Sequence, residues 1–274
     1  MSETADIKAA VKERYARAIQ QPGSGCCGGS GTTAMKGTLV QIAGYRDEDL
    51  AALPADAVAN AFGCGNPVAF AEVREGDVVV DIGSGAGIDC LFAAQKVGPS
   101  GKVIGIDMTP DMIERARANA RAADATNVEF RQGDAERMPV ADGEADWVIS
   151  NCVINLSPDK PAVFREIARV LKPGGRISIS DIVAEDLPPA VRASRDAWVT
   201  CLAGAISEAE YVRGLERAGL ADVRVTERVT YGPDKLEGLF GSSACCPEGG
   251  ALTPNDVRAA AGKVWSARFT GRKA

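Results

Sequence analysis

Between residues 77 and 181 the sequence alternates short apolar segments with segments of helical periodicity, and this alternation constrains the fold more than any other feature. The first apolar segment, residues 77–82, is a hydrophobic run of the kind that a buried parallel strand requires. Further strand patterns occupy 102–107, 128–131, 146–151 and 176–181, with helical patterns at 88–97, 110–123 and 159–171 and a turn at 172–175. Such alternation predicts an α/β fold with a doubly wound, mostly parallel sheet and right-handed crossovers.

The rest of the chain of 274 residues follows other patterns, which predict three parts. Residues 1–75 are expected to form an N-terminal helical extension that includes a loop rich in Gly and Ser. Residues 76–184 would form a Rossmann-like domain, and residues 185–274 a smaller C-terminal α+β part that completes the site. Helical patterns in the two flanking parts cover 5–20, 47–62, 187–205 and 207–218, and a strand pattern covers 221–231.

Composition and charge exclude several classes of function. The chain has 31 Lys and Arg against 37 Asp and Glu, and its net charge of −6 argues against partners that are nucleic acids or anionic membranes. It has no histidine, which excludes Ser-His-Asp and Cys-His catalysis and zinc held by histidine. The first twenty residues lack the apolar core of a signal peptide, so we expect a cytoplasmic protein whose eight cysteines are reduced.

Residues 81–87 (DIGSGAG) carry the strongest local motif, because they follow a predicted strand and open a predicted helix. Their glycines permit a tight turn and close approach of a ligand, and Asp107, at the end of the next strand, can accept hydrogen bonds from ribose hydroxyls. The spacing G-x-G-x-G departs from the dinucleotide pattern, and Asp81 would repel a pyrophosphate but suit a cationic group. The motif therefore favours S-adenosylmethionine over a dinucleotide as the cofactor, the alternative being an ordinary glycine-rich turn.

The cofactor residues expected from this motif lie at the ends of four strands. Asp134 could accept a hydrogen bond from an adenine amino group, although a solvated turn explains it equally well. Asn151 ends the fourth strand, at the edge where open α/β sheets bind ligands. The candidate cofactor-binding residues are Asp81, Gly83, Ser84, Gly85, Asp107, Met108, Asp134, Ala135 and Asn151.

The cysteines form no C-x-x-C pair, so neither a zinc knuckle nor a thioredoxin motif is present. Cys152 is informative because it directly follows a strand end beside the expected cofactor. Cys64 lies between two glycines, where a core-filling role is not expected, whereas Cys90 on the helix after the glycine turn is expected to be a small buried side chain. The remaining cysteines are Cys26, Cys27, Cys201, Cys245 and Cys246.

Taken together, these motifs resemble the arsenite S-adenosylmethionine methyltransferase family over roughly residues 40–231. The specific part is the run SNCVINLSPDK at 150–160 together with the isolated Cys64 and Cys201, whereas the glycine turn and the sequence KPGG at 172–175 are shared by many methyltransferases. One departure from the family pattern is Phe62, where relatives often carry Tyr. The resemblance implies the class I S-adenosylmethionine-dependent methyltransferase fold.

The resemblance also implies roles for individual cysteines. Cys152 and Cys201 match the two thiols that hold trivalent arsenic throughout, and Cys64 matches the third. Cys26 or Cys27 would act as the redox partner, with thioredoxin or glutathione as the external reductant. The substrate would be trivalent arsenic, either free or as a thiol conjugate. The Cys245-Cys246 pair matches no family motif.

The chemistry of arsenic agrees with this interpretation. Trivalent arsenic is soft and prefers thiolates to imidazole or carboxylate ligands. Arsenic held by three thiolates keeps a lone pair that can attack a methyl carbon directly, so that no general base is required and the absence of histidine is explained. Two alternatives remain: a methyltransferase acting on a small metabolite such as a quinone, and a thiol-based protein that binds or senses a soft metal.

Overall fold

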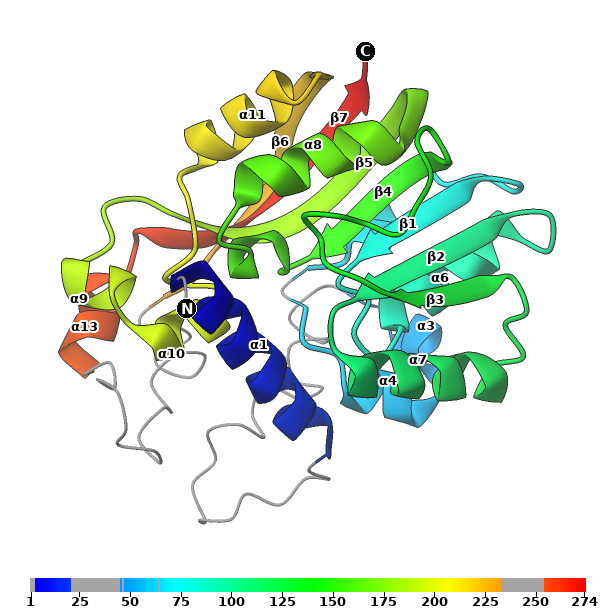
Figure 1. Cartoon of the computed structure of the whole chain (residues 1–274), viewed down its shortest axis with the longest axis horizontal. Helices are drawn as coiled ribbons and strands as arrows, with labels where there is room; N and C mark the ends of the chain where they lie inside the picture. The colour runs from blue at the N-terminus through cyan, green and yellow to red at the C-terminus, as the bar shows by residue number, and fades with distance from the viewer. Residues whose placement is uncertain (1–2, 21–44, 46, 64, 233–253) are drawn as a thin grey trace.

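The computed structural model of the chain describes residues 3–20, 45, 47–63, 65–232 and 254–274, and these form one seven-stranded sheet with helices on both faces (Figure 1). The strand order is β3-β2-β1-β4-β5-β7-β6. The first five strands pair in parallel, whereas β7 runs antiparallel to both β5 and β6. The strands are β1 (Val78–Ile82), β2 (Lys102–Asp107), β3 (Val128–Gln132), β4 (Ala145–Asn151), β5 (Leu171–Ala184), β6 (Leu220–Thr230) and β7 (Val264–Lys273).

This architecture confirms the predicted fold class, a doubly wound and mostly parallel sheet. The strands β6 and β7 of the C-terminal part join the same sheet as β1–β5. The division of the chain into three parts at residues 75 and 184 stays a prediction. The helices are α1 (Glu3–Gln20), α3 (Asp47–Ala51), α4 (Ala55–Ala59), α5 (Pro67–Phe70), α6 (Ile88–Val97), α7 (Pro110–Ala122), η1 (Ile154–Leu156), α8 (Lys160–Val170), α9 (Pro189–Arg192), α10 (Arg195–Val199), α11 (Glu208–Arg217) and α13 (Pro254–Ala259).

Two predicted helices are each divided into two shorter ones, at a proline in one case and at a capping serine in the other. The pattern at 47–62 forms α3 and α4, because Pro54 lacks a backbone N–H and adopts an extended conformation just before α4. The pattern at 187–205 forms α9 and α10, and the Ser194 side chain caps α10 by accepting a hydrogen bond from the backbone N–H of Ala197 at 3.2 Å. The turn predicted at 172–175 lies within β5 as an interruption of its pairing with β4, which passes from Leu171 directly to Arg176.

The helices cover the sheet in two layers, each with its own hydrophobic cluster. On one face α8 and α11 bury Phe164, Ile167 and Tyr211 against the sheet, and on the other face α6 and α7 bury Leu91 and Ile113 (Figure 1). Among the described residues, no helix has the length and apolar character needed to cross a membrane.

The helix α1 lies across the carboxyl ends of the parallel strands (Figure 1). Its Val11 is fully buried and belongs to a third cluster, with Cys152, Leu156 and Cys201. The far end of α1 is fixed to α7, because Arg115 donates a hydrogen bond to the carbonyl oxygen of Ile19 at 2.8 Å. The N-terminal helix α1 therefore covers the edge at which an open α/β sheet binds ligands.

Candidate active site

A cavity opens where β1, β2 and β4 end, below α1. Its empty volume is about 980 Å³, which includes the open solvent at its mouth. Its lining includes most of the residues predicted to bind the cofactor: Gly83, Ser84, Gly85, Asp107, Met108, Ala135 and Asn151. Cys152 lines the same cavity, and α1 contributes Lys8, Val11 and Tyr15.

The glycine turn between β1 and α6 forms the floor of the cavity. Gly83 has a φ of +73°, and a Cβ atom at this position would overlap the Val153 side chain, so only glycine fits. The Ser84 hydroxyl is buried and has no hydrogen-bond partner among the described residues. A buried polar atom without a partner costs free energy, and a polar group of a bound ligand would remove that cost.

Asp107 is held in place by the turns on either side of it. Its Oδ2 accepts a hydrogen bond from the backbone N–H of Gly85 at 3.0 Å, and its Oδ1 accepts one from that of Thr109 at 2.8 Å. Burial raises the pKa of Asp107, whereas the hydrogen bonds from Thr109 and Gly85 oppose the rise. A carboxylate has about four acceptor positions, so this one keeps capacity for the hydroxyls of a ribose.

Two of the predicted cofactor residues do not line this cavity. The Asp81 carboxylate lies beneath the glycine turn, where its Oδ2 accepts a hydrogen bond from the Cys90 thiol at 3.2 Å and burial raises its pKa well above the usual value. Asp89, which the sequence analysis did not single out, lines the cavity, whereas Asp81 does not. Cofactor contacts by Asp81 stay a prediction, as do those of Asp134.

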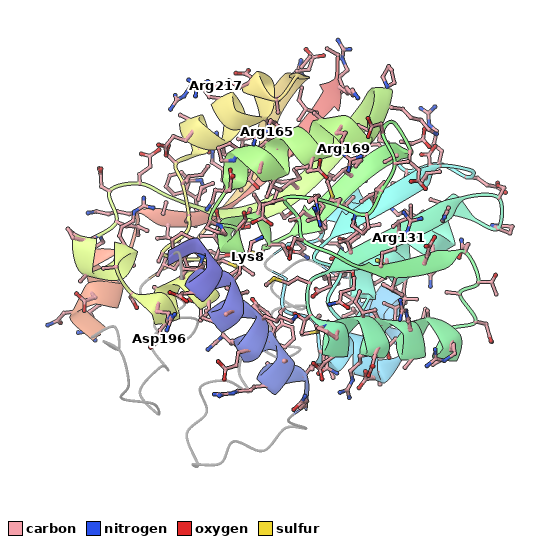
Figure 2. The ribbon with its side chains drawn as sticks, viewed as in Figure 1. Lys8, Arg131, Arg165, Arg169, Asp196 and Arg217 are labelled. Carbon is pink, nitrogen blue, oxygen red and sulfur yellow. The ribbon has the colours of Figure 1, made fainter. Side chains whose placement is uncertain are left out.

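Asp134 is exposed and takes part in the attachment of α1 to the rest of the site. Lys8 on α1 (Figure 2) pairs with Asp134 at 3.6 Å and with Glu136 at 2.8 Å. Glu136 also accepts a hydrogen bond from the Ser157 hydroxyl at 2.6 Å. These contacts fix α1 over the cavity. The sequence analysis did not predict this role for Lys8 or Glu136, because a common charged residue carries no local signal for a contact between distant segments.

Cys152 and Cys201 meet beside the cavity although 49 residues separate them. The Cys201 thiol donates a hydrogen bond to the carbonyl oxygen of Cys152 at 2.9 Å. Both residues adopt left-handed backbone conformations, with φ values of 59° and 67°, which cost free energy in any residue with a side chain. Such strain is retained when the surrounding structure requires it, and it gathers at functional sites.

The described cysteines differ in state. Cys152 is disulfide-bonded, whereas Cys90 and Cys201 are free and buried. Burial raises the pKa of the Cys201 thiol well above its usual value; Asp181 raises it further and Lys160 opposes the rise. Cys90 is fully buried, as the sequence predicts. Cys26, Cys27, Cys64, Cys245 and Cys246 lie outside the described residues.

Comparisons with known proteins agree with this geometry. A family model described as a methyltransferase domain matches residues 74–219. The chain is 34% identical to CrArsM, an arsenic (III) S-adenosylmethionine methyltransferase from Chlamydomonas reinhardtii, with a TM-score of 0.66 over 81% of this chain and 71% of that one. This chain belongs to the arsenite methyltransferase family. Family membership and the fit of the cavity assign S-adenosylmethionine as its cofactor.

Other relatives place limits on what this membership shows. Arsenite methyltransferases of Halobacterium salinarum and Aquipseudomonas alcaligenes are 44% and 36% identical over 80% and 79% of this chain. The chain spans 58% and 63% of the length of these two proteins. A putative sarcosine dimethylglycine methyltransferase from Galdieria sulphuraria, 22% identical with a TM-score of 0.56 over 74% of this chain and 80% of that one, shares the fold alone.

Proposed function

We propose that this member of the arsenite methyltransferase family transfers a methyl group from S-adenosylmethionine to trivalent arsenic bound by Cys64, Cys152 and Cys201. One observation carries the proposal: two cysteines from distant segments meet beside the cofactor cavity, with the Cys201 thiol 2.9 Å from the carbonyl oxygen of Cys152. A methyltransferase acting on a metabolite has no need of this pair. Thiolates are the ligands that a soft ion such as trivalent arsenic prefers.

Arsenite can bind these thiols without a general base. Each hydroxyl group of arsenite leaves as water and takes the proton of one incoming thiol, so that three thiols replace three hydroxyl groups and no charge is left behind. This exchange suits Cys201, whose raised pKa keeps it a thiol near neutral pH. It also fits a chain without histidine.

The residues of the cavity would hold the cofactor and keep water out. Ser84 and Asp107 offer polar groups to it, while Val11 and Tyr15 of α1 cover it. When bound, S-adenosylmethionine supplies an electrophilic methyl group, and the arsenic lone pair can attack the carbon of that group directly. Cys152 and Cys201 hold the substrate in line with that group, and such alignment supplies much of the rate enhancement of a two-reactant step.

Turnover would require a thiol reductant. Arsenic that gives its lone pair to a methyl group becomes formally pentavalent, and two electrons from a pair of thiolates restore the trivalent state and leave a disulfide. Cys26 or Cys27 would pair with Cys64, and thioredoxin or glutathione, in the cytoplasm, would reduce the disulfide. Without a reductant we expect methylation to stop after about one methyl group per protein, measured as product against time; many turnovers would contradict the disulfide step.

The decisive experiment incubates the reduced protein with arsenite and S-adenosylmethionine and measures arsenic speciation. Methylated arsenic supports the proposal, whereas bound but unmethylated arsenite indicates a soft-metal-binding protein. A protein that neither methylates nor binds arsenite would be a methyltransferase of another metabolite. Cys152→Ser and Cys201→Ser should abolish methylation while cofactor binding survives, because the Ser hydroxyl is a hard ligand that stays protonated near neutral pH. Cys90→Ser is the matched control and should remain active.

A further inference from the structure

The two glycines that flank Cys64 in the sequence both lie against the side chain of Asn151. The backbone N–H of Gly65 donates a hydrogen bond to Asn151 Oδ1 at 3.0 Å, and Asn151 Nδ2 donates one to the carbonyl oxygen of Gly65 at 2.6 Å. A Cβ atom at Gly63 would overlap the Asn151 amide group. The amide of Asn151 therefore fixes the backbone on both sides of position 64, and Asn151 itself directly precedes Cys152.

Two further side chains hold the Asn151 amide in this orientation. Asn151 Nδ2 also donates to Asp89 Oδ2 at 3.1 Å, and the Tyr45 hydroxyl donates to Asp89 Oδ1 at 2.6 Å. Tyr45 and Asp89 are buried, and the Tyr45 ring stacks on Phe92 with centroids 5.2 Å apart. The Asp89 carboxylate can only accept a hydrogen bond, so the amide group that faces it must be the Nδ2 of Asn151. The amide therefore presents its oxygen to the N–H of Gly65 and its nitrogen to the carbonyl of Gly65, and not the reverse.

We propose that Asn151 is a positioning residue that sets the distance between the thiols of Cys64 and Cys152, and that Tyr45 and Asp89 lock its orientation. The proposal rests on the proposed function for its meaning, since these thiols are two of the three arsenic ligands. It assigns Asn151 a role other than contact with the cofactor, because both polar atoms of its amide are used within the protein.

The positioning can be measured without arsenic, by oxidising the thiols of Cys64 and Cys152 to a disulfide and measuring how readily that bond forms. Glutathione disulfide oxidises the two thiols to a protein disulfide and is itself reduced to two glutathione thiols. The equilibrium constant of this exchange reports how close the two thiols are held. Mass spectrometry of the linked peptides quantifies this disulfide separately from any disulfide between Cys64 and Cys26 or Cys27, so the competing pair is measured and accounted for.

The variants are Tyr45→Phe and Asn151→Ala, with Tyr211→Phe as the matched control. Tyr45→Phe keeps the ring and its packing and removes only the hydroxyl. It should lower the equilibrium constant about fivefold, the effect of one net hydrogen bond, and Asn151→Ala should lower it further. Tyr211 also donates its hydroxyl to a buried aspartate, Asp181 at 3.2 Å, but on the opposite face of the sheet. Its variant should leave the equilibrium constant unchanged within about twofold.

The dissociation constants of arsenite and of S-adenosylmethionine complete the test. Tyr45→Phe should weaken arsenite binding by about the same fivefold factor and leave cofactor binding unchanged. An unchanged disulfide equilibrium in both Tyr45→Phe and Asn151→Ala would overturn the proposal, as would an equal change in Tyr211→Phe. If the wild-type protein bound no arsenite, the proposed function would fail, whereas the disulfide equilibrium would still decide whether Asn151 positions Cys64.

Discussion

Two buried networks built from the same three residue types lie on either side of Cys152. In the first, Asp89 accepts hydrogen bonds from the Tyr45 hydroxyl at 2.6 Å and from Asn151 at 3.1 Å. In the second, Asp181 accepts them from the Tyr211 hydroxyl at 3.2 Å and from Asn155 at 2.9 Å. We call them the Asp89 network and the Asp181 network. The two asparagines are four positions apart in the same segment, one before Cys152 and one after it.

The networks differ in what surrounds them. Asp89 and Asn151 line the cavity, and Asn151 uses its amide to hold the backbone at Gly65. Asp181 and Asn155 are fully buried, and Asp181 also accepts hydrogen bonds from the backbone N–H groups of Asn155 and Ile182. The same set of groups therefore serves a ligand-facing segment in one place and the folded core in the other.

The Asp181 network also supports the segment that carries Cys201. The carbonyl oxygen of Asn155 accepts a hydrogen bond from the buried ammonium group of Lys160 at 3.4 Å, and this group lies 5.4 Å from the Trp198 ring centroid. Trp198 in turn donates its Nε1–H to the carbonyl oxygen of Leu156 at 3.2 Å. Lys160 is only 8% exposed, so little solvent reaches this side of Cys152, and this burial lowers the pKa of Lys160 to about 8.

The largest contrast should appear when the two asparagines are removed. Asn155→Ala deletes a hydrogen bond to a buried carboxylate and leaves groups around it without partners, so the free energy of unfolding should fall by roughly 3–5 kcal/mol. Asn151→Ala acts beside the cavity, where water can replace the amide, and should cost about 1 kcal/mol. Urea unfolding measures both, and equal losses would show that the two networks do not differ in their contribution to stability.

The pH dependence of stability should separate the two carboxylates. Burial raises the pKa of Asp181 to about 7 and that of Asp89 to about 6, the hydrogen bonds from their partners opposing the rise in both cases. In the unfolded chain both groups ionise near a pH of about 4, so the folded state binds more protons above that pH and loses stability as the pH rises through each raised pKa.

Between about pH 5 and about pH 8, Asp181 should account for a loss of about 2–3 kcal/mol in the free energy of unfolding and Asp89 for about half as much. Urea unfolding of Asp181→Asn and Asp89→Asn across this window measures each share as the flattening of the pH dependence. A wild-type protein that gains stability from these groups as the pH rises would contradict the assigned directions.

The smallest contrast between the two networks should come from their tyrosine hydroxyls. Tyr45→Phe and Tyr211→Phe each keep a stacked ring and lose one hydrogen bond to a carboxylate, so each should lower the free energy of unfolding by about 1–2 kcal/mol. Because their stabilities should match, any difference in arsenite binding between the two variants reflects position and not general loosening. If only Tyr211→Phe weakened arsenite binding, the Asp181 network would be the one that positions the thiols.

Local rules were sufficient to predict the frame of the site. The alternation between residues 77 and 181 predicted the sheet, and the rule that parallel strands end at one edge predicted that the glycine turn, Asp107 and Cys152 lie together. These patterns are readable because periodicity and turn chemistry depend on residues close in the sequence. Helical periodicity alone predicted two helices that the structure divides, one at Pro54 and one at Ser194, because a single residue changes the backbone there.

Only the tertiary structure decided which side chains meet across the site. Tyr45 and Asp89 are 44 residues apart, Cys152 and Cys201 49, and Gly65 and Asn151 86. It placed Asp81 below the glycine turn and brought Asp89 to the cavity, although the two carboxylates are only eight positions apart in the sequence. No local pattern encodes such pairs, because a buried hydrogen bond depends on where separate elements pack against each other. The sequence by itself determined the strands and the thiols, and the packing of α1, α6 and α10 around them determined their partners.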